Sequence, residues 1–428
     1  MGRSTYCFGA RVAFGVLAAI VLVARPMVPV RAQTPTAPQA VAGEVRGLWV
    51  QSTTLTSAKS IQQMVDTARR AGFNTLLVDV RSRGEAFYDS RVEPRANVLD
   101  EAATGFDPLA LTLTAAHSAG LKVHAWFTVG LVSSAVALPR SREHVAARHP
   151  EWLMVPRRAA NMLRAMPPDM PIYVGEIARA ARATAATVDG IYQSPVAAAS
   201  RDYTVRVVTD LVSRYAVDGL HLDALRYPTD DFDYSAQTLG AFRAEMAPTV
   251  PADMRDRFDR LAKSEVAAWA DGLPEAWSRF RQAKLTTLLS ALRSAATKAR
   301  PGLFISASVS PDADEARTQR LQDWRAWTAH SLLDAVCPMV DSTDATVLST
   351  SLAAAKRDAS TVPVWAGIGA YKLSVERAAE HVKSARRVGV GGILLFSYDS
   401  LAAIDGPADF FTLIRPALLD ESSLERRR

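Results

Sequence analysis

Short apolar segments that suit strands alternate with amphipathic segments that suit helices along most of this chain. Between the first two strands, Ile61, Met64, Val65 and Ala68 recur at helical spacing, and Gly72 follows as a left-handed helix end. The strand segments are residues 45–50, 74–80, 121–127, 217–223, 303–310, 333–340, 362–368 and 390–398. Eight strands with intervening helices predict an α/β fold, a (β/α)8 TIM barrel formed by one domain.

Two stretches depart from this alternation. Residues 133–200 form a longer, irregular segment, and the proline-rich run at 166–171 within it cannot be helical. Residues 229–275 follow the fourth strand and show little strand character, so we expect an insertion at the mouth of the barrel. The barrel domain is predicted to span residues 44–418, followed by a polar tail at 419–428.

The N-terminus has the pattern of a secretory signal. Two arginines accompany an apolar run at 12–24, and residues 30–32 resemble a small-x-small cleavage site. We therefore expect a signal peptide at 1–32, a linker at 33–43, and a secreted or periplasmic protein. No stable membrane insertion is expected after cleavage; an uncleaved N-terminal anchor is the alternative.

Charge and cysteine content narrow the class of protein. Lys and Arg total 50 against 44 Asp and Glu, and the basic residues form no stripe with interleaved aromatics. Nucleic acid is therefore not an expected partner. Cys7 lies in the predicted signal, which leaves Cys337 as the single mature cysteine, so no internal disulfide can form. Cys337 sits in an apolar run, where we expect a buried, unreactive thiol.

The most distinctive motif is V-D-G-L-H-L-D-A-L-R-Y-P at residues 217–228. Side chains alternate faces along a strand, so His221 and Asp223 share one face and the intervening leucines take the other. If the leucines face the outer helices, Asp223 lies inside the barrel at the carboxyl end of its strand, where barrel enzymes carry their chemistry. Arg226 and Tyr227 follow at once. An Asp after a strand also serves as a helix cap or turn residue, and this alternative stays open.

The same reasoning brings polar and aromatic side chains from several strand ends to one rim. The candidates are Asp79, Arg81, Arg83, Glu85, His124, Trp126, His221, Asp223, Arg226, Tyr227, Asp341, Trp365, Tyr398 and Asp399. Sugars present hydroxyl groups that carboxylates and arginines bind, and apolar ring faces on which aromatic side chains stack. Glycosidic cleavage needs one carboxyl as an acid and usually a second carboxyl as nucleophile or base. The mixture predicts a polysaccharide substrate and no cofactor.

Structural roles are alternatives for several candidates. Ion pairs that fix the loop after the second strand are an alternative role for Asp79, Arg81, Arg83 and Glu85. Packing in the core is an alternative role for His124, Trp126, Trp365 and Tyr398. A metal site is an alternative role for His124, His221 and Asp223, although no closely spaced metal-binding motif is present.

Seven motifs together resemble the glycosyl hydrolase-like 10 barrels, also called the domain-of-unknown-function 187 family. They are R-G-L-W-V at 46, G-F-N-T-L-L-V-D-V-R at 72, F-D-P-L-A at 106, A-H-S-A-G-L-K-V-H-A-W-F at 116, H-P-E-W-L at 149, the motif at 217 and G-G-I-L-L-F-S-Y at 391. The resemblance covers residues 44–415 and implies a (β/α)8 barrel acting on carbohydrate. Described members include bacterial lipoproteins that cut peptidoglycan strands freed of peptides. The resemblance implies Asp223 as the catalytic residue, with Glu85 first and Asp341 second as candidates for its partner.

The chain departs from the pattern of this family at several positions. Relatives often carry Gln where this chain has Asp79, and Asn where it has Thr128. They often carry a second Asp in place of Ala224 and Tyr in place of Asp341. The predicted signal also lacks a lipobox, so a lipid anchor is not expected.

We therefore expect a glycoside hydrolase that cleaves a cell-wall, peptidoglycan-like or related polysaccharide by carboxylate acid/base catalysis. A non-catalytic glycan-binding barrel at the cell wall is the alternative, and a second carboxylate within reach of Asp223 favours the enzyme. A solute-binding protein would need two similar lobes, and the sequence shows no such duplication.

Overall fold

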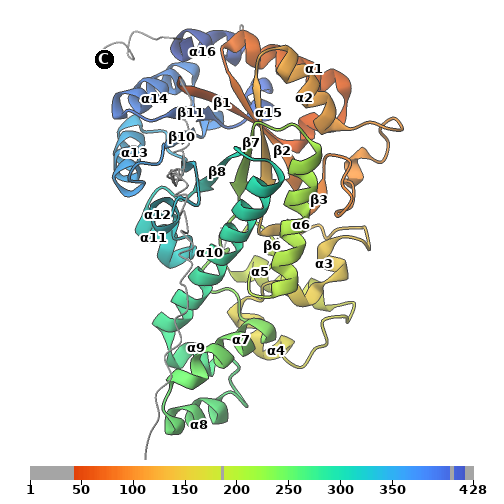
Figure 1. Cartoon of the computed structure of the whole chain (residues 1–428), viewed down its shortest axis with the longest axis vertical. Coiled ribbons are helices and arrows are strands. Elements are labelled where there is room, and N and C mark those ends of the chain that lie inside the picture. Colours follow the sequence, from red (N-terminus) through yellow and green to blue (C-terminus); the bar gives the residue numbers. More distant parts are fainter. Residues whose placement is uncertain (1–42, 185–187, 405–408, 420–428) are drawn as a thin grey trace, which may run out of the picture. The chain divides into compact units, whose positions relative to one another are not determined.

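Eight parallel strands close into a barrel in the computed structural model (Figure 1). They are β1 (Val45–Val50), β2 (Thr75–Ser82), β4 (Lys122–Thr128), β7 (Gly219–Asp223), β8 (Phe304–Val309), β9 (Ala335–Val340), β10 (Trp365–Ile368) and β11 (Gly392–Leu395). The ring closes because β1 pairs in parallel with both β2 and β11. A two-residue strand, β3 (Glu85–Ala86), adds to β2 in antiparallel register. The predicted TIM barrel is confirmed.

The structure covers residues 43–184, 188–404 and 409–419. The predicted signal peptide at 1–32, nearly all of the predicted linker at 33–43 and residues 420–428 of the predicted tail lie outside the described residues. Within the covered stretches, no helix combines the length and the apolar character needed to cross a bilayer.

The last strand is shorter than the predicted segment 390–398. Strand β11 ends at Leu395, and Ser397 then caps a new helix, α15 (Tyr398–Ala402). The Ser397 hydroxyl accepts a hydrogen bond from the backbone N–H of Ser400, and this local bond turns the chain out of the strand. Tyr398 therefore belongs to a helix that follows the strand.

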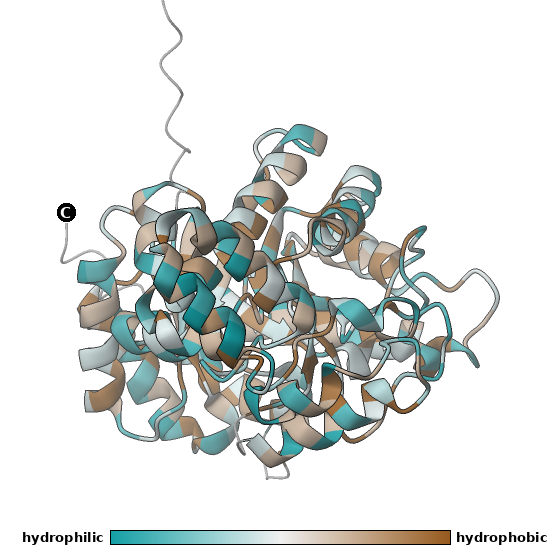
Figure 2. Ribbon diagram, turned by 90° about the horizontal axis from the view of Figure 1, so that it is seen from below, coloured by the Kyte–Doolittle hydropathy of each residue, from teal (hydrophilic) through white to brown (hydrophobic). Residues whose placement is uncertain are grey.

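Helices cover the barrel between successive strands. They are η1 (Ser52–Thr56), α1 (Ala58–Ala71), η2 (Asn97–Leu99), α2 (Pro108–Ser118), α6 (Ala198–Arg214), α10 (Pro274–Ala299), α11 (Ala313–Gln319), α12 (Trp324–Ala329), α13 (Ala345–Asp358), η5 (Ala370–Lys372), α14 (Val375–Val388), α15 and α16 (Phe410–Leu419). Teal and brown residues alternate along these peripheral helices in Figure 2, as expected for helices with one buried face. Helix α1 ends at Gly72 with φ of 92°, the left-handed cap that the sequence predicts.

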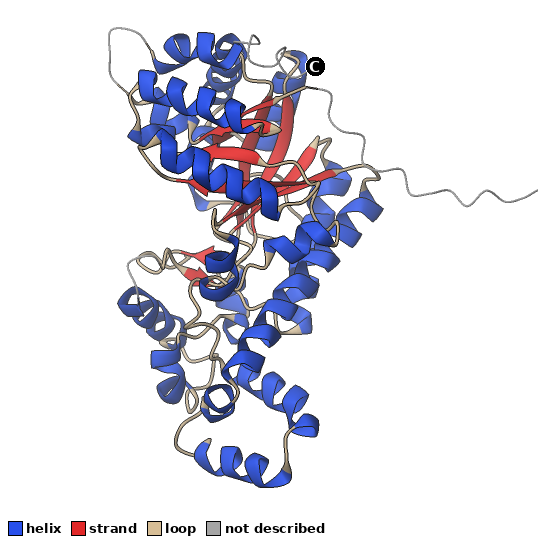
Figure 3. Cartoon of the chain, turned by 90° about the vertical axis from the view of Figure 1, so that its left-hand side faces the viewer, coloured by secondary structure: helices blue, strands red, loops and turns tan. Residues whose placement is uncertain are grey.

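Two excursions after β4 and β7 form what we call the lobe, residues 129–184, 188–197 and 224–273. Its elements are β5 (Leu131–Ser133), α3 (Val145–Arg148), η3 (Pro150–Trp152), α4 (Arg157–Leu163), α5 (Tyr173–Thr184), β6 (Ile191–Tyr192), α7 (Ala236–Met246), η4 (Ala247–Thr249), α8 (Ala252–Leu261) and α9 (Ala268–Gly272). Strands β5 and β6 pair only with each other among the described strands, apart from the barrel sheet (Figure 3). An ion pair of 2.6 Å between Arg157 and Asp271 joins the two excursions. The insertion predicted at 229–275 is confirmed.

The barrel interior is filled by its own apolar cluster. The inward side chains are Val45, Trp49, Leu77, Ala335, Cys337, Trp365 and Leu394, with Trp126, Phe304, Met339 and Phe396 packed against them. A larger cluster lies between the strands and the outer helices and includes Leu220 and Leu222, as the alternation in the 217–228 motif predicts. Burial raises the pKa of the Cys337 thiol well above its ordinary value, which disfavours the thiolate.

Substitution of Gly219 tests how tightly the barrel interior is packed. A Cβ atom at Gly219 would lie 2.6 Å from the ring of His124, whereas one at Gly240, on α7, would meet nothing within 4 Å. We expect Gly219→Ala to destabilise the protein by about 1–3 kcal/mol through overpacking. Gly240→Ala should instead stabilise it by about 0.5–1 kcal/mol, because alanine favours the helix. Equal unfolding midpoints in denaturant for the two variants would contradict this packing.

Candidate active site

Asp223 lies at the carboxyl end of β7 with both carboxylate oxygens hydrogen-bonded. Its Oδ2 accepts from Trp126 Nε1 at 3.1 Å, and its Oδ1 accepts from the hydroxyl of Ser308. These donors come from the two neighbouring strands, β4 and β8. The next helix, α7, is capped by Ser235 instead. The alternative role of Asp223 as a helix cap is therefore wrong.

Asp79 projects from β2 into the same barrel and is 5% exposed. Burial raises the pKa of Asp79 to about 7; hydrogen bonds from Ser82 and Ser52 oppose the shift, and the negative charge of Asp223 adds to it. Its Oδ1 has no hydrogen-bond partner among the described residues. Asp79 therefore keeps a proton at pH values where an ordinary aspartate has lost it.

His221 lies deeper in the barrel than Asp223, two residues earlier on the same strand. It is fully buried, its Nδ1 bonds the Ser306 hydroxyl at 2.9 Å, and Nε2 has no partner in the described structure. Burial lowers the pKa of His221 to about 4, although the charge of Asp223 opposes the shift. A neutral imidazole therefore forms part of the floor beneath the two carboxyl groups.

Aromatic rings line the barrel beside these carboxyl groups. Phe396 contacts Trp49, Trp126 and Tyr371 with ring centroids 6.0, 6.1 and 6.1 Å apart, respectively. Only Trp126 belongs to the predicted set. Trp49 and Phe396 could have been found from the inward parity of their strands, because each occupies the face that the predicted residues share.

Asp341 follows β9 and lies at the same end of the barrel. Its Oδ2 accepts from Lys372 Nζ at 2.5 Å and from the Tyr371 hydroxyl at 3.4 Å. Its side chain is 52% exposed, so water screens its charge. Asp341 can bind a ligand at the rim, but the geometry gives it no contact with Asp223.

Glu85 is the first candidate for the catalytic partner of Asp223. It lies on β3, where its carboxylate accepts from Asn97 Nδ2 at 3.1 Å. Burial raises the pKa of Glu85, and the charges that act on it come from Asp100 and Glu93. These groups belong to the loop after β2, and the role of Glu85 as the partner of Asp223 stays a prediction.

Arg81 is a structural residue outside the barrel mouth. A register irregularity between Asp79 and Arg81 turns its side chain away from the interior. Its Nη2 and Nε donate to Glu93 at 2.6 and 2.7 Å, with both side chains fully buried. The predicted substrate role is therefore wrong, and the alternative pairing of Arg81 with Asp79 or Glu85 is wrong too, because its ion-pair partner is Glu93. Arg83 is exposed in the following turn, where its carbonyl oxygen accepts from His144 Nε2.

His124 and Trp365 face inward but lie at the opposite, amino end of the barrel. Their rings are 5.8 Å apart, and both contact Phe304 at the start of β8. A cavity of 420 Å³ opens beside them between the beginnings of the strands. The prediction that they join the rim is wrong. The alternation of side chains shows which residues face inward, but it does not show how far along the strand each one lies. Burial lowers the pKa of His124 to about 3.

The surroundings of three further predicted site residues, Tyr227, Tyr398 and Asp399, differ from the prediction. Tyr227 is fully buried beneath the lobe, and its hydroxyl has no described partner. Tyr398 packs on Phe411 of α16 and faces a surface hollow outside the barrel. Asp399 accepts from the backbone N–H of Gln51 at 2.7 Å and so fixes the chain after β1. Tyr227 and Tyr398 are therefore packing residues, whereas the substrate role of Asp399 stays a prediction.

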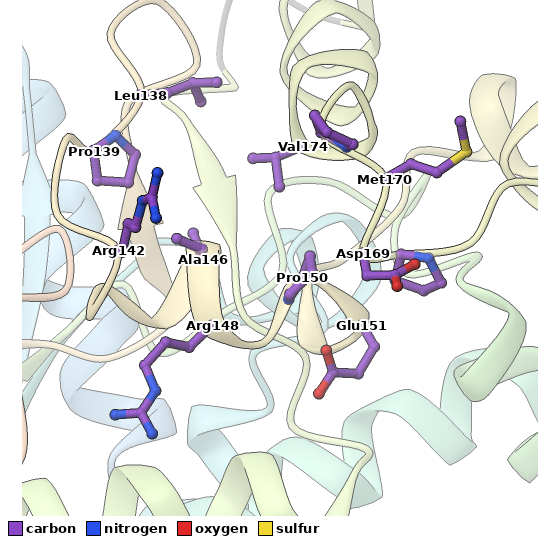
Figure 4. A pocket seen from close by; sticks show the side chains of 13 residues that line it. Leu138, Pro139, Arg142, Ala146, Arg148, Pro150, Glu151, Asp169, Met170 and Val174 are labelled. Atoms are coloured by element: carbon purple, nitrogen blue, oxygen red, sulfur yellow. The ribbon is translucent and has the colours of Figure 1, made fainter.

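A surface hollow of 730 Å³ lies in the lobe and holds none of the predicted site residues. In Figure 4, Arg142 and Arg148 lie on one side of it and Glu151 and Asp169 on the other. Two of these charges are already paired, Arg148 with Glu143 and Glu151 with His149. In the part of the chain that the structure describes, no three His, Cys, Asp or Glu side chains are arranged to hold a metal ion.

Inward carboxyl groups at the carboxyl end of a (β/α)8 barrel, flanked by aromatic rings, define a glycoside hydrolase-like TIM barrel. The model of the family Glycosyl hydrolase-like 10 matches residues 44–382, and the chain belongs to this family. The resemblance stated from the motifs is confirmed.

Curated relatives are distant and match this chain over only part of their length. The chain is 25% identical to Glycosyl hydrolase YngK of Bacillus subtilis over 171 residues, which are 39% of this chain and 28% of that protein. It is 24% identical to Glycosyl hydrolase DigH of Escherichia coli K12 over 231 residues, 46% of each chain. The chain thus spans less than half the length of either relative.

Solved structures support the fold alone, because their sequences are far from this one. The glycoside hydrolase domain of PgaB (BpsB) from Bordetella bronchiseptica superposes with a TM-score of 0.62 at 13% identity, covering 88% of this chain and 99% of that one. The catalytic domain of beta-amylase from Paenibacillus polymyxa gives a TM-score of 0.57 at 14% identity, covering 89% and 99%.

The buried Arg81–Glu93 pair gives a test of the structural assignment. We expect Arg81→Met to cost about 3–5 kcal/mol of unfolding free energy, because it leaves the Glu93 charge buried without a partner. The double variant Arg81→Met/Glu93→Gln should recover part of that loss. Arg279→Met breaks an exposed pair with Glu275 and should cost about 0.5 kcal/mol or less. An Arg81→Met variant as stable as Arg279→Met in denaturant titrations would contradict the assignment.

Proposed function

We propose that this protein is a glycoside hydrolase in which Asp79 and Asp223 form the pair of catalytic carboxyl groups. The observation that carries the proposal is the burial of the Asp79 carboxyl, which raises its pKa to about 7, inside the same barrel as the negatively charged Asp223. Environments that push the pKa values of two carboxyls apart give one acid and one carboxylate at the same pH. Glycosidic cleavage requires that combination.

The proposed roles follow from the surroundings of each group. Asp79 holds a proton near neutral pH and donates it to the glycosidic oxygen as the bond to the sugar breaks. Asp223 remains a carboxylate, held by Trp126 and Ser308, and either attacks the anomeric carbon or activates a water. Trp126, half-buried beside Asp223, can pack against a sugar ring.

The proposed substrate is a bacterial cell-wall, peptidoglycan-like or related polysaccharide, and the proposed location is the periplasm or the exterior of the cell. The family motifs support the proposed substrate, and the signal pattern at 1–32 supports the proposed location. Digestion of purified, peptide-free peptidoglycan strands, followed by mass spectrometry of the products, tests the substrate. New reducing ends on short glycans are expected; intact strands beside a digested control with a known glycosidase would argue against it.

Asp223→Asn is expected to lower kcat by about 10²–10⁴-fold, because an amide can neither act as a base nor attack as a carboxylate. Glycan binding should persist, since the amide keeps the shape and some hydrogen bonds. Asp344→Asn is the matched control: Asp344 caps α13 after β9, and Asn caps about as well as Asp. Steady-state kinetics should separate the two variants, and a wild-type rate for Asp223→Asn would end the proposal.

The assignment of Asp79 predicts a pH profile. The rate should fall as pH rises above about 7, because Asp79 then loses the proton that it must donate. Asp79→Asn should lower kcat on natural glycans by about 10²–10⁴-fold. An aryl glycoside whose leaving group departs without protonation should restore turnover by Asp79→Asn but not by Asp223→Asn. No rescue, with a level profile between about pH 6 and about pH 9, would remove Asp79 as the acid.

A non-catalytic glycan-binding barrel gives a different outcome in the same experiments. It would bind glycan strands with unchanged product spectra, and Asp79→Asn and Asp223→Asn would alter affinity alone.

A further inference from the structure

A second small pocket opens beside Asp223 on the side of the lobe. It has a volume of 230 Å³, and its polar lining residues are Asp223, Arg226, Ser308, Ser310, Arg320 and Gln322. Sites for drug-sized ligands typically have volumes of about 300–1,000 Å³. The smaller volume of this pocket suits one sugar ring or a ring substituent. The catalytic carboxylate and two arginines therefore share one small enclosure.

Backbone contacts hold the two arginines on the same wall. The N–H of Tyr227, next to Arg226, donates to the carbonyl oxygen of Arg320 at 3.0 Å. The guanidinium of Arg320 in turn donates to the carbonyl oxygen of Pro228. The chain after β7 and the end of α11 are thus tied together, and the position of each guanidinium is built into the fold.

The positive charge in this pocket is only partly compensated. Arg226 Nη2 pairs with Asp189 at 3.0 Å, a partner whose side chain is 45% exposed. Arg226 Nη1 is buried without a hydrogen-bond partner in the described structure, and a buried, unsatisfied charged donor is costly. Burial and the charge of Arg226 together lower the pKa of Arg320. An anion bound in this pocket would therefore stabilise both guanidinium groups.

We propose that Arg226 and Arg320 bind a carboxylate carried by the substrate glycan, on the sugar that occupies the pocket beside Asp223. The proposal rests on the proposed function and adds to it a class of substrate, an acidic polysaccharide. A carboxylate fits because its two oxygens can each accept from one guanidinium, and such charge-assisted hydrogen bonds are strong and directional. The arginines also offset the repulsion between the bound carboxylate and Asp223. The carboxylate can come from a lactyl ether substituent or from the ring of a uronic acid.

The test compares matched glycans before and after reduction of their carboxyl groups to alcohols. One pair carries lactyl ethers and the other carries uronic acids, so the pair that shows a preference names the source. We expect kcat/KM of the wild type to favour one carboxylate form by about 10–100-fold over its reduced form. Arg320→Gln should remove most of that preference, measured as the ratio of kcat/KM on the two forms of one pair, so that a change in rate common to both forms, from the lost bond to Pro228, cancels. A wild type that does not discriminate within either pair, or an Arg320→Gln that slows both forms equally, overturns the proposal.

Arg317→Gln is the matched control, because Arg317 lies on α11, the helix that ends just before Arg320, is exposed and does not line the pocket. It should keep the full preference for the carboxylate. Calorimetric binding of the same glycans separates this proposal from the proposed function. Preferential binding of a carboxylate form that Arg320→Gln abolishes supports the anion site even if no glycan is cleaved. Cleavage or binding with no preference for a carboxylate form refutes the anion site but not the proposed function. A lack of binding to all four glycans refutes the anion site as well.

Discussion

Burial of the Asp79 carboxyl inside the barrel is the constraint on which the rest of the site depends. The surrounding strands fill the interior with apolar side chains and leave Oδ1 of Asp79 without a donor, so its charged form is unfavourable. Asp223 has the opposite surroundings, because Trp126 and Ser308 donate to its two oxygens from the neighbouring strands. The two aspartates therefore have different surroundings in one barrel, and burial raises the pKa of Asp79 to about 7. The proposed division into acid and carboxylate follows from that difference.

The barrel and the lobe contribute different parts of the site. Barrel strands hold Asp79, His221 and Asp223 at fixed depths, so the reacting groups sit on rigid elements. The lobe begins where β4 and β7 end and brings Asp189 and Arg226 to the same mouth. Residues on connecting segments commonly carry specificity in barrel enzymes, and here they place positive charge beside Asp223.

Much of the fold could be predicted from the sequence, because strand–helix alternation and caps are local signals. Strand parity also placed Asp79, Trp126, His221 and Asp223 on the inner face. The alternation of side chains does not show how far along a strand a residue lies. It therefore predicts the wrong end of the barrel for His124 and Trp365, which lie near the beginnings of their strands. The irregularity after Asp79 was invisible in the pattern, and it sends Arg81 outward to Glu93. Glu85 resembled a catalytic residue by family motif alone. The pKa of Asp79 depends on burial by strands distant in the sequence, which no local pattern encodes.

The most direct measurement of the central claim is the pKa of Asp79 itself, followed by NMR of its carboxyl carbon and assigned with Asp79→Asn. A pKa of about 7 is expected in the wild type, well above the ordinary 3.8. Asp223→Asn should lower it, because the variant removes a negative charge that favours the proton. A value near 3.8 in the wild type, unchanged in Asp223→Asn, would contradict the account, since both carboxyls would then be ionised at neutral pH and neither could serve as the acid.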